Sequence, residues 1–476
     1  MPSVKKNFIY SSILTTANYV FPLLTYPYIS RVLGVDNIGA VNFVDSIVSY
    51  FILFAMMGIG VCGIREIAAS TGDRLRMSRS FSSLLLLSTI TTAIAVIGLA
   101  AATLLVPKLQ ANSSMMHMGV IKLGFTYLCI EWFYQGLEDF SYITRRTIFV
   151  KSLFVASVFL FVRDPDDYAV YYLLMCMMVA VNAVINIVHA RKFVTFSFRG
   201  ISFRPFVRPF LIMGVFLFLT SMYTSFNVAY LGFVTNDTQV GYYTTAVKLY
   251  SIILALFTAF TGVMMPRMCA LLANKEIEKF KAYFYKSTDA LMSFALPAIV
   301  FSMVMAPEII LLLSGPNYEG AITPMRIVMP LILIIGYEQV LVIQTHMPLK
   351  KDNVISRNSF IGAGVGVGLN LLLVPMLQSV GSAIVWLVCA VVVLILSQIA
   401  VSKAVHIKSP YLKFGKMLLV YIPLGFMLIF LNTFIFEGIW RLMAGGIVTL
   451  TYMVSYNMMF ERDGVVIGLI NKIVRR

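Results

Sequence analysis

The chain has 476 residues, 59% of them hydrophobic and only 12% charged, with a net charge of +16. A soluble domain carries about 25% charged residues, so the composition excludes an ordinary soluble protein and predicts a polytopic membrane protein. The positive charge could indicate a nucleic-acid partner, but lysine and arginine also collect in the cytoplasmic loops of membrane proteins. We therefore expect no nucleic acid. No hydrophilic stretch is long enough for a separate soluble domain.

Apolar stretches long enough to cross about 30 Å of hydrocarbon recur from one end of the chain to the other. The first follows a basic N-terminus, but it is long and no small-residue cleavage site follows it, so we interpret it as an uncleaved membrane helix. Hydropathy predicts fourteen helices in an all-α fold. Their approximate ranges are 8–30, 38–61, 81–106, 115–138, 147–162, 169–188, 210–234, 241–265, 287–313, 325–346, 354–375, 380–402, 416–435 and 439–459.

Lysine and arginine residues predict the orientation of these helices. All but seven of the 37 fall in segments that are cytoplasmic when the N-terminus is cytoplasmic, as the positive-inside rule requires. An odd number of helices would destroy this alternation, so we expect both termini in the cytoplasm. The seven others are Arg31, Lys108, Lys122, Arg163, Lys248, Arg326 and Arg441.

The chain contains an internal repeat. Residues 39–65 align with residues 241–267 without a gap, at a constant offset of 202. The offset places helices 1 and 2 on helices 7 and 8, so both copies start on the same side of the membrane and the repeat is parallel. The matched residues are Gly39 with Gly241, Gly60 with Gly262, Val61 with Val263 and Arg65 with Arg267.

The repeat predicts two six-helix lobes and two additional C-terminal helices. We expect an N-terminal lobe over 1–209, a second lobe over 210–402, and the two extra helices with a cytoplasmic tail over 403–476. Transporters use repeats of this kind to build two lobes around a central site near the middle of the membrane.

Polar residues inside these helices are candidates for such a site, because in lipid they must face protein or water. A charge at mid-helix costs about 2.5–3.5 kcal/mol on insertion scales, so Asp45 and Lys248 favour a water-filled cavity. Asn42 in helix 2 and Asn227 in helix 7 lie on stripes of serine, threonine and glycine. For the small residues themselves, packing between helices is the simpler interpretation.

Five further charged residues lie within predicted helices or at their ends. Arg31 and Arg326 lie near helix ends, where they either bind substrate or anchor the helix at the membrane surface. Lys122 lies inside helix 4 and could extend its ammonium to the surface. Glu131 and Glu338 are buried acids that could face the cavity or carry a coupling ion. Lys122 and Glu131 are nine residues apart, which places them on opposite sides of a continuous helix.

The segment IEWFYQGLEDFSYITRR (130–146) combines a tryptophan, three acids and two arginines at the predicted cytoplasmic exit of helix 4. We interpret Arg145 and Arg146 as the anchor of that exit. Glu131 would lie about 10 Å inside it. Gln135 and Glu138 lie on the same side of the predicted helix as Glu131, which predicts that this side faces water.

The sequence contains no recognisable catalytic or metal site. It has no phosphate-binding GxxxxGK[ST] motif, and its four histidines and five cysteines lack metal-ligand spacing. The glycines of GAGVGVGLN (362–370) recur at a spacing of four, which is typical of close helix packing. We therefore expect no cofactor, no bound metal and no enzymatic activity.

Several segments together resemble the Wzx-type oligosaccharide flippases of the MOP superfamily. The similarity covers nearly the whole chain and implies a fourteen-helix, two-lobed bundle like that of MATE exporters. It places the motif lysine of the family at Lys248. Where helix 7 of the family often has an aspartate, this chain has Asn227, which argues against proton coupling through that helix. The segments are IEWFYQGLEDFSYITRR, ISRVLGVDNIG (29–39), YFILFAMMGIGVCGIREIA (50–68), FVRDPDDYAVYYLL (161–174), VGYYTTAVKLYSI (240–252) and LLLSGPNYEGAITPMRI (311–327).

The resemblance implies a function. Such flippases move undecaprenyl-pyrophosphate-linked sugar repeat units from the cytoplasmic to the periplasmic leaflet by alternating access, and we expect coupling to an ion gradient. The expected location is the bacterial inner membrane. The expected partners are the lipid-linked substrate, membrane lipids and a glycan polymerase. The main alternative is a MATE-type, cation-coupled exporter of drugs or other small molecules, which would favour an acidic cavity. A membrane enzyme would need a large external loop, which the chain lacks.

Overall fold

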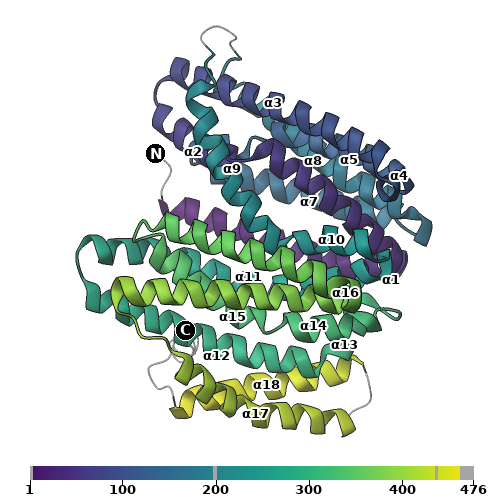
Figure 1. The fold of residues 1–476 in the computed structure, drawn as a ribbon, viewed down its shortest axis with the longest axis vertical. Helices are drawn as coiled ribbons and strands as arrows, with labels where there is room; N and C mark the ends of the chain where they lie inside the picture. Colours follow the sequence, from purple (N-terminus) through teal and green to yellow (C-terminus); the bar gives the residue numbers. More distant parts are fainter. Residues whose placement is uncertain (1–3, 197–200, 435–437, 461–476) are drawn as a thin grey trace. The chain divides into compact units, whose positions relative to one another are not determined.

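The computed structural model describes residues 4–196, 201–434 and 438–460, and in these ranges every regular element is helical. The expected all-α fold is confirmed (Figure 1). Eight helical segments in the described part of the chain are long and apolar enough to span a membrane, or nine if one bent pair counts as a span. The predicted cytoplasmic tail after residue 460 lies outside the described residues.

Breaks inside the longest helices divide them into spans of ordinary length. α1 (Val4–Met56) is kinked at Gly34, whose φ of 75° is accessible to glycine and rare for other residues. α16 (Asp352–Val405) is kinked at Gln378, which has a φ of 53°. Each of these elements therefore supplies two of the expected helices. The helices fit the expected fourteen spans, and the count itself stays a prediction.

Contacts between helices divide the chain into two compact units, Met1–Gly241 and Tyr242–Arg476. The first unit contains α1 to α10 and the first turn of α11 (Asp237–Ala273). The expected lobe limits at residues 209 and 402 stay predictions. The other helices of the first unit are α2 (Ile59–Ser70), α3 (Arg74–Leu105), α4 (Pro107–Ala111), α5 (Ser113–Thr126), α6 (Glu131–Gly136), α7 (Phe140–Phe161), α8 (Tyr168–Ala190), α9 (Arg204–Thr224) and α10 (Phe226–Val234).

The second unit contains the rest of α11, the kinked α16 and a C-terminal hairpin. Its core includes Met292, Tyr421 and Leu428, each at most 1% exposed, which join the hairpin to α12. A π-helical turn, Val342–His346, follows α15 within the tenth predicted span. The other helices are α12 (Ile277–Val304), α13 (Ala306–Ser314), α14 (Ile322–Val328), α15 (Leu331–Leu341), α17 (Tyr411–Phe434) and α18 (Ile439–Phe460).

The fourth predicted helix, 115–138, is not continuous, contrary to expectation. α5 ends at Thr126, a 3-10 turn covers Tyr127–Cys129, and α6 begins at Glu131. Ile130 between them has a φ of 35°, a left-handed conformation that is costly for a β-branched residue. Because the helix is interrupted, the helical phase that separated Lys122 from Glu131 does not apply.

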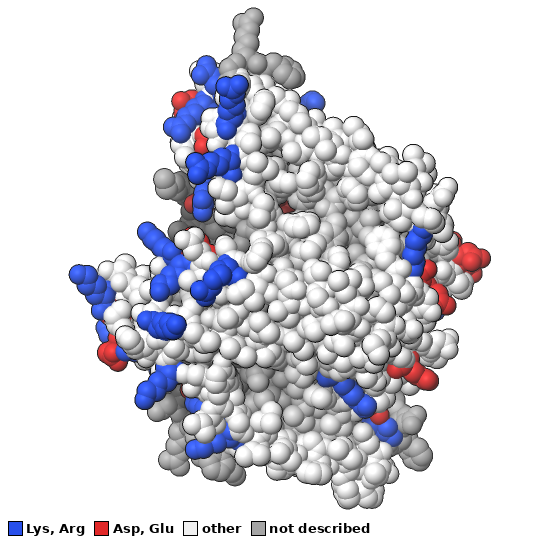
Figure 2. All heavy atoms as spheres, viewed as in Figure 1, with Lys and Arg blue, Asp and Glu red and all other residues white. Residues whose placement is uncertain are grey.

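Lysine and arginine gather at one end of the helices in each unit, taken separately (Figure 2). In the first unit they surround the turn between α2 and α3, where Arg65 and Arg74 are exposed. In the second unit they surround the turn between α11 and α12, where Lys275 and Lys279 are exposed. The long apolar flanks between the helix ends are those of membrane-spanning bundles. Which end faces the cytoplasm stays a prediction.

Contacts inside the first unit reproduce the internal repeat. A Cβ on Gly39 would lie 1.8 Å from the carbonyl oxygen of Asp237. A Cβ on Gly241 would lie 2.4 Å from the carbonyl oxygen of Val35. At the offset of 202, residue 35 corresponds to 237 and residue 39 corresponds to 241, so the two contacts are reciprocal. Reciprocal contacts of this kind arise around a twofold axis.

A third contact lies at the same crossing. The Thr238 hydroxyl donates to the Asp36 carboxylate over 2.5 Å, and these two residues are themselves separated by the repeat offset of 202. A residue meets its own repeat equivalent only where the symmetry axis passes between them. The crossing of the two chain segments is thus a pseudo-twofold point within the first unit.

Alanine at Gly39 or Gly241 is expected to lower the yield of folded protein several-fold, because the added methyl group would collide with a backbone carbonyl. The matched controls are Gly60→Ala and Gly262→Ala, since a Cβ at either glycine meets nothing within 4 Å. Size-exclusion chromatography of detergent-extracted protein should show a loss for the first two variants alone. Equal yields of all four variants would contradict this packing.

Candidate functional site

The first candidate site is an ion pair between α1 and α5 that joins two of the predicted site residues. The Lys122 ammonium lies 2.5 Å from a carboxylate oxygen of Asp45. Both side chains are largely buried, with 15% of Lys122 and 24% of Asp45 exposed. Pairing is the usual way in which charges are kept inside a membrane. Lys122 therefore does not extend alone toward the membrane surface.

Close packing of α1 against α5 sets the distance between these charges. A Cβ on Gly119 would lie 2.5 Å from a methyl carbon of Val48 and 3.2 Å from the hydroxyl oxygen of Tyr172 in α8. Gly119 precedes Lys122 by about one turn of α5, and Val48 follows Asp45 by about one turn of α1. The glycine lets the two helices approach until their charged side chains meet.

The second candidate site is an ion pair between α6 and α7. Arg146 Nη2 lies 2.6 Å from Glu131 Oε1 and donates to Thr147 Oγ1 over 3.0 Å. Only 2% of the Arg146 side chain is exposed, whereas 50% of Glu131 is exposed. The interpretation of Arg146 as a surface anchor is wrong, because α7 places its side chain in the protein interior.

The buried guanidinium keeps unused hydrogen-bonding capacity. A guanidinium carries five N–H donors, and Nε and Nη1 of Arg146 are buried without an acceptor among the described residues. Unsatisfied donors on a buried charge are costly, and ionisable residues inside membranes mark functional sites. An anion with several oxygens would supply the missing acceptors.

Asn186 of α8 holds the break that positions Glu131. Its side-chain amide donates to the carbonyl of Cys129, where the helix is interrupted. The Tyr134 hydroxyl donates to the backbone carbonyl of Asn186 over 2.5 Å, and the Tyr142 hydroxyl donates to its side-chain oxygen over 3.0 Å. Asn186 is fully buried. Sequence reasoning missed this residue, because one asparagine in an apolar helix does not reveal its partners.

Aromatic packing holds α6 from its other side. The Trp132 ring lies so close to α2 that a Cβ on Gly63 would be 2.4 Å from it. Phe81 of α3 packs against both Trp132 and Phe133, with ring centroids 5.7 and 5.0 Å apart. These rings belong to the hydrophobic core of the first unit. These contacts fix the α6 backbone and so define the position from which the Glu131 side chain reaches Arg146.

The other predicted residues of the first unit are members of neither ion pair. Asn42 donates to a carbonyl one turn earlier in α1 over 2.8 Å, and Asn227 is fully buried in α10. Arg31 is exposed near the kink of α1. Lys151 lies within α7, inside the fifth predicted helix, and donates to the Asn18 side chain of α1 over 2.8 Å.

In the second unit, Lys248 of α11 and Glu338 of α15 are both half-buried. Arg326 of α14 donates to a backbone carbonyl of α12 over 3.1 Å. An ion pair that sequence reasoning missed joins Arg441 of α18 to Glu308 of α13 at 2.5 Å, with 12% and 7% of the side chains exposed. It fastens the C-terminal hairpin to the rest of this unit. A cavity beside Lys248 or Glu338 stays a prediction.

Hydroxyl groups inside the predicted membrane helices often bond within their own helix. Thr15, Thr25 and Ser251 each donate to the carbonyl four residues earlier, over 2.8–3.1 Å. Such a bond satisfies a hydroxyl without a ligand or a cavity. For these residues packing is the better interpretation, and the charged pairs form the candidate site.

Comparison with known proteins gives a family for the chain. A family model described as "Polysaccharide biosynthesis protein" matches residues 4–272. Two relatives bear the name "Putative O-antigen transporter". The one from Escherichia coli (strain K12) is 26% identical over 399 residues, which are 80% of this chain and 92% of the relative. The one from Shigella dysenteriae is 24% identical over 371 residues, which are 76% and 90% of the two chains.

Solved structures share the fold. The lipid II flippase MurJ, in its inward closed conformation, matches with a TM-score of 0.76 at 12% identity, over 96% of this chain and 99% of MurJ. An inward-facing multidrug resistance MATE family transporter of the MOP superfamily matches with a TM-score of 0.65 at 16% identity, over 82% of this chain and 96% of the transporter. At these identities the likeness shows the fold alone. Because the family model covers more than half of the chain, the protein belongs to the polysaccharide biosynthesis protein family, with the fold of MOP superfamily transporters.

Proposed function

We propose that this protein is a flippase that moves undecaprenyl-pyrophosphate-linked oligosaccharides from the cytoplasmic to the periplasmic leaflet of the bacterial inner membrane. The names of the relatives and the fold support this proposal. The observation that carries it is the presence of two cations, Lys122 and Arg146, each held by a carboxylate inside one apolar helical unit. An anionic diphosphate that leaves water needs such partners.

The ion pairs suit reversible binding of an anion. Without substrate, each carboxylate neutralises its cation, so neither pair leaves an uncompensated charge in the membrane. An arriving diphosphate competes for the cation, and Arg146 offers a planar fork that matches phosphate oxygens. Because the substrate gains Lys122, and the Nη2 group of Arg146, only when the pairs separate, its binding favours the conformation in which they are apart.

Separation of the pairs also frees the carboxylates, which provides a route to ion coupling. Asp45 and Glu131 would then carry uncompensated charges that a proton or Na⁺ can neutralise. Uptake of the cation on one side and its release on the other would drive export along an ion gradient. Glu338 in the second unit is a third acid for this role. Alternating access of two lobes to a central site completes the cycle.

Further contacts with the substrate are assigned to the remaining predicted residues. Lys248, Arg31 and Arg326 would bind phosphate or acidic sugars, and the amides of Asn42 and Asn227 would donate to sugar hydroxyls. The exported repeat unit would then serve a glycan polymerase, which is the expected protein partner.

A cation-coupled exporter of the MATE type is the second candidate, because it shares the fold with a TM-score of 0.65. Cationic substrates favour an acidic cavity. In the first unit, however, Lys122 and Arg146 already neutralise Asp45 and Glu131, which favours an anionic substrate. A deletion strain with normal surface glycan and raised drug sensitivity would support the exporter.

A deletion strain tests the proposed function directly. Loss of the gene should abolish surface glycan and leave undecaprenyl-pyrophosphate-linked oligosaccharide accumulated in the membrane, where mass spectrometry detects it. The wild-type gene on a plasmid should restore both to normal. Unchanged surface glycan together with no accumulated lipid-linked sugar in the deletion strain would overturn the proposal.

Lys248→Ala should insert and express normally, because removal of a charge inside a membrane helix makes insertion easier. It should fail to restore surface glycan in the deletion strain. Lys248→Arg should retain part of the activity, since arginine keeps the charge but differs in shape and hydration. The readouts are immunoblotting of membranes and surface-glycan staining. Wild-type glycan from well-expressed Lys248→Ala would exclude this role and leave Arg31 and Arg326 as candidates.

A further inference from the structure

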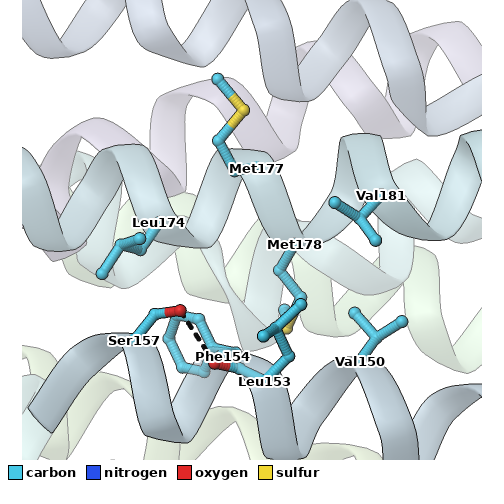
Figure 3. A pocket seen from close by; sticks show the side chains of 8 residues that line it. All are labelled: Val150, Leu153, Phe154, Ser157, Leu174, Met177, Met178 and Val181. Carbon is cyan, nitrogen blue, oxygen red and sulfur yellow. Dashed lines mark hydrogen bonds between the residues drawn. The ribbon is translucent and has the colours of Figure 1, made fainter. Parts of the chain in front are cut away.

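An open groove lies between α7 and α8 in the first unit (Figure 3), and its empty space of about 310 Å³ includes the part that is open to the surroundings. Leu153 and Met177 at its rim are 48% and 42% exposed, whereas Val150 at its base is 2% exposed. Figure 3 shows Met178 of α8 pointing across the groove toward α7. The groove is therefore an indentation in the apolar surface, bounded by one row of side chains from each helix.

The lining of this groove suits a hydrocarbon chain. Seven of its eight lining residues are apolar. The eighth, Ser157, donates its hydroxyl to the Leu153 carbonyl over 2.9 Å and so presents no unused donor. The flexible thioethers of Met177 and Met178 adapt to an irregular chain. A ligand in the groove would gain dispersion contacts and lose no hydrogen bond to water.

The groove continues a row of α7 that begins at the second ion pair. Arg146, Val150 and Phe154 are four residues apart and are therefore neighbours on one side of the helix. At 1.5 Å per residue, Val150 follows Arg146 by about 6 Å along the axis. The exposed Arg145 begins the adjacent row, which leads to Leu153. One helix thus presents a cationic end and an apolar groove in direct succession.

We propose that this groove binds the polyprenyl chain of the lipid-linked substrate while the diphosphate lies at Arg146. The inference rests on the proposed flippase function and adds the position of the lipid tail. The head group decides between possible occupants. Nε and Nη1 of Arg146 are buried and have no acceptor in the described part of the chain. A diphosphate attached directly to its chain supplies several oxygens at the start of the groove. A membrane phospholipid, with one phosphate separated from its chains by glycerol, is the alternative that the experiment must exclude.

Photocrosslinking in cells tests the occupant. A photoreactive amino acid is placed at Leu153 of the full-length protein, and at Ile97 of α3 as the control. Ile97 is 70% exposed on another helix of the same unit. After irradiation, mass spectrometry should find polyprenyl adducts at position 153 and only phospholipid adducts at position 97. Phospholipid adducts alone at both positions would overturn the proposal.

Filling the groove provides a second test. Met178→Trp should reduce surface glycan and the polyprenyl adduct at position 153 by about tenfold or more, while Ile97→Trp should change neither. Where Met178→Trp fails to reach the membrane, the adducts at position 153 decide alone. The deletion strain separates the two proposals. Accumulated lipid-linked sugar without a polyprenyl adduct at 153 rejects the groove and keeps the flippase, whereas normal glycan in the deletion strain rejects both.

Discussion

Exchange of the charges of the first pair, by Asp45→Lys combined with Lys122→Asp, is expected to preserve the folded protein and strongly reduce glycan export. The exchanged side chains can still pair across the 2.5 Å contact, so no charge is left uncompensated. The cation, however, moves from α5 to α1. A charge-assisted hydrogen bond contributes about 1.5–3 kcal/mol, so loss of its contact with the diphosphate should lower export by about tenfold or more.

Single variants separate folding from function at this pair. Lys122→Ala leaves Asp45 without a partner and should destabilise the unit by about 3 kcal/mol. The double variant Asp45→Ala with Lys122→Ala should regain most of that loss and still fail to export. Thermal unfolding in detergent measures the first quantity, and surface glycan in the deletion strain measures the second. Wild-type export by the exchanged pair would reduce it to a structural contact between α1 and α5.

Removal of Glu131 is expected to destabilise the protein more than removal of its partner Arg146. After Glu131→Ala, a guanidinium with 2% exposure keeps its charge with one fewer acceptor, which costs about 3–5 kcal/mol when a buried pair is broken. After Arg146→Ala, the remaining carboxylate is 50% exposed and can be hydrated. The midpoint of thermal unfolding should therefore fall further for Glu131→Ala.

The variants of Arg146 and Glu131 should rank differently in export activity than in thermal stability. Arg146→Ala removes the proposed diphosphate ligand and should abolish export. Arg146→Lys should recover only part of it, because an ammonium cannot offer two parallel N–H groups to phosphate. Glu131→Gln keeps the acceptor oxygen and should remain folded, with slower release of the bound substrate. Equal thermal midpoints for the two alanine variants, with full export by Arg146→Ala, would remove this pair from the mechanism.

Hydropathy and charge were sufficient to predict the class of fold. Each predicted span has a helical counterpart in the described residues because apolar length decides what crosses a membrane. The kink at Gly34 also agrees with the sequence, since Gly34 lies between the first two predicted helices, 8–30 and 38–61, and glycine accepts its φ of 75°. The break at Ile130 does not. Neither glycine nor proline occurs over 125–135, and the cause lies in α8, where Asn186 bonds to the interrupted backbone.

The charged pairs likewise combine features that nearby sequence predicts with features that depend on contacts between distant helices. Asp45 could be identified as a candidate site residue from the sequence, because a carboxylate inside a membrane helix is costly and usually functional. Its partner was not, because Lys122 approaches it only through the packing of Gly119 against Val48. Arg146 was misinterpreted because the positive-inside rule depends on the predicted helix limits, and the fifth helix was predicted to begin only at residue 147. α7 begins at Phe140, before both arginines, and of these two adjacent residues Arg146 is buried and Arg145 is exposed.

At the crossing of the two repeats, the number of residues between the contacting carbonyl and glycine matters more than the types of those residues. Gly39 meets the carbonyl of Asp237, and Gly241 meets that of Val35, so each copy supplies a carbonyl and, four positions later, a glycine. Most residues between them are free to differ, as they do here. One residue inserted between the carbonyl and the glycine of either copy would change their spacing. Because that carbonyl belongs to one contact and that glycine to the other, the two contacts could no longer form at the same time. In proteins that descend from the same duplication, we therefore expect substitutions in this segment to be common and insertions or deletions to be absent.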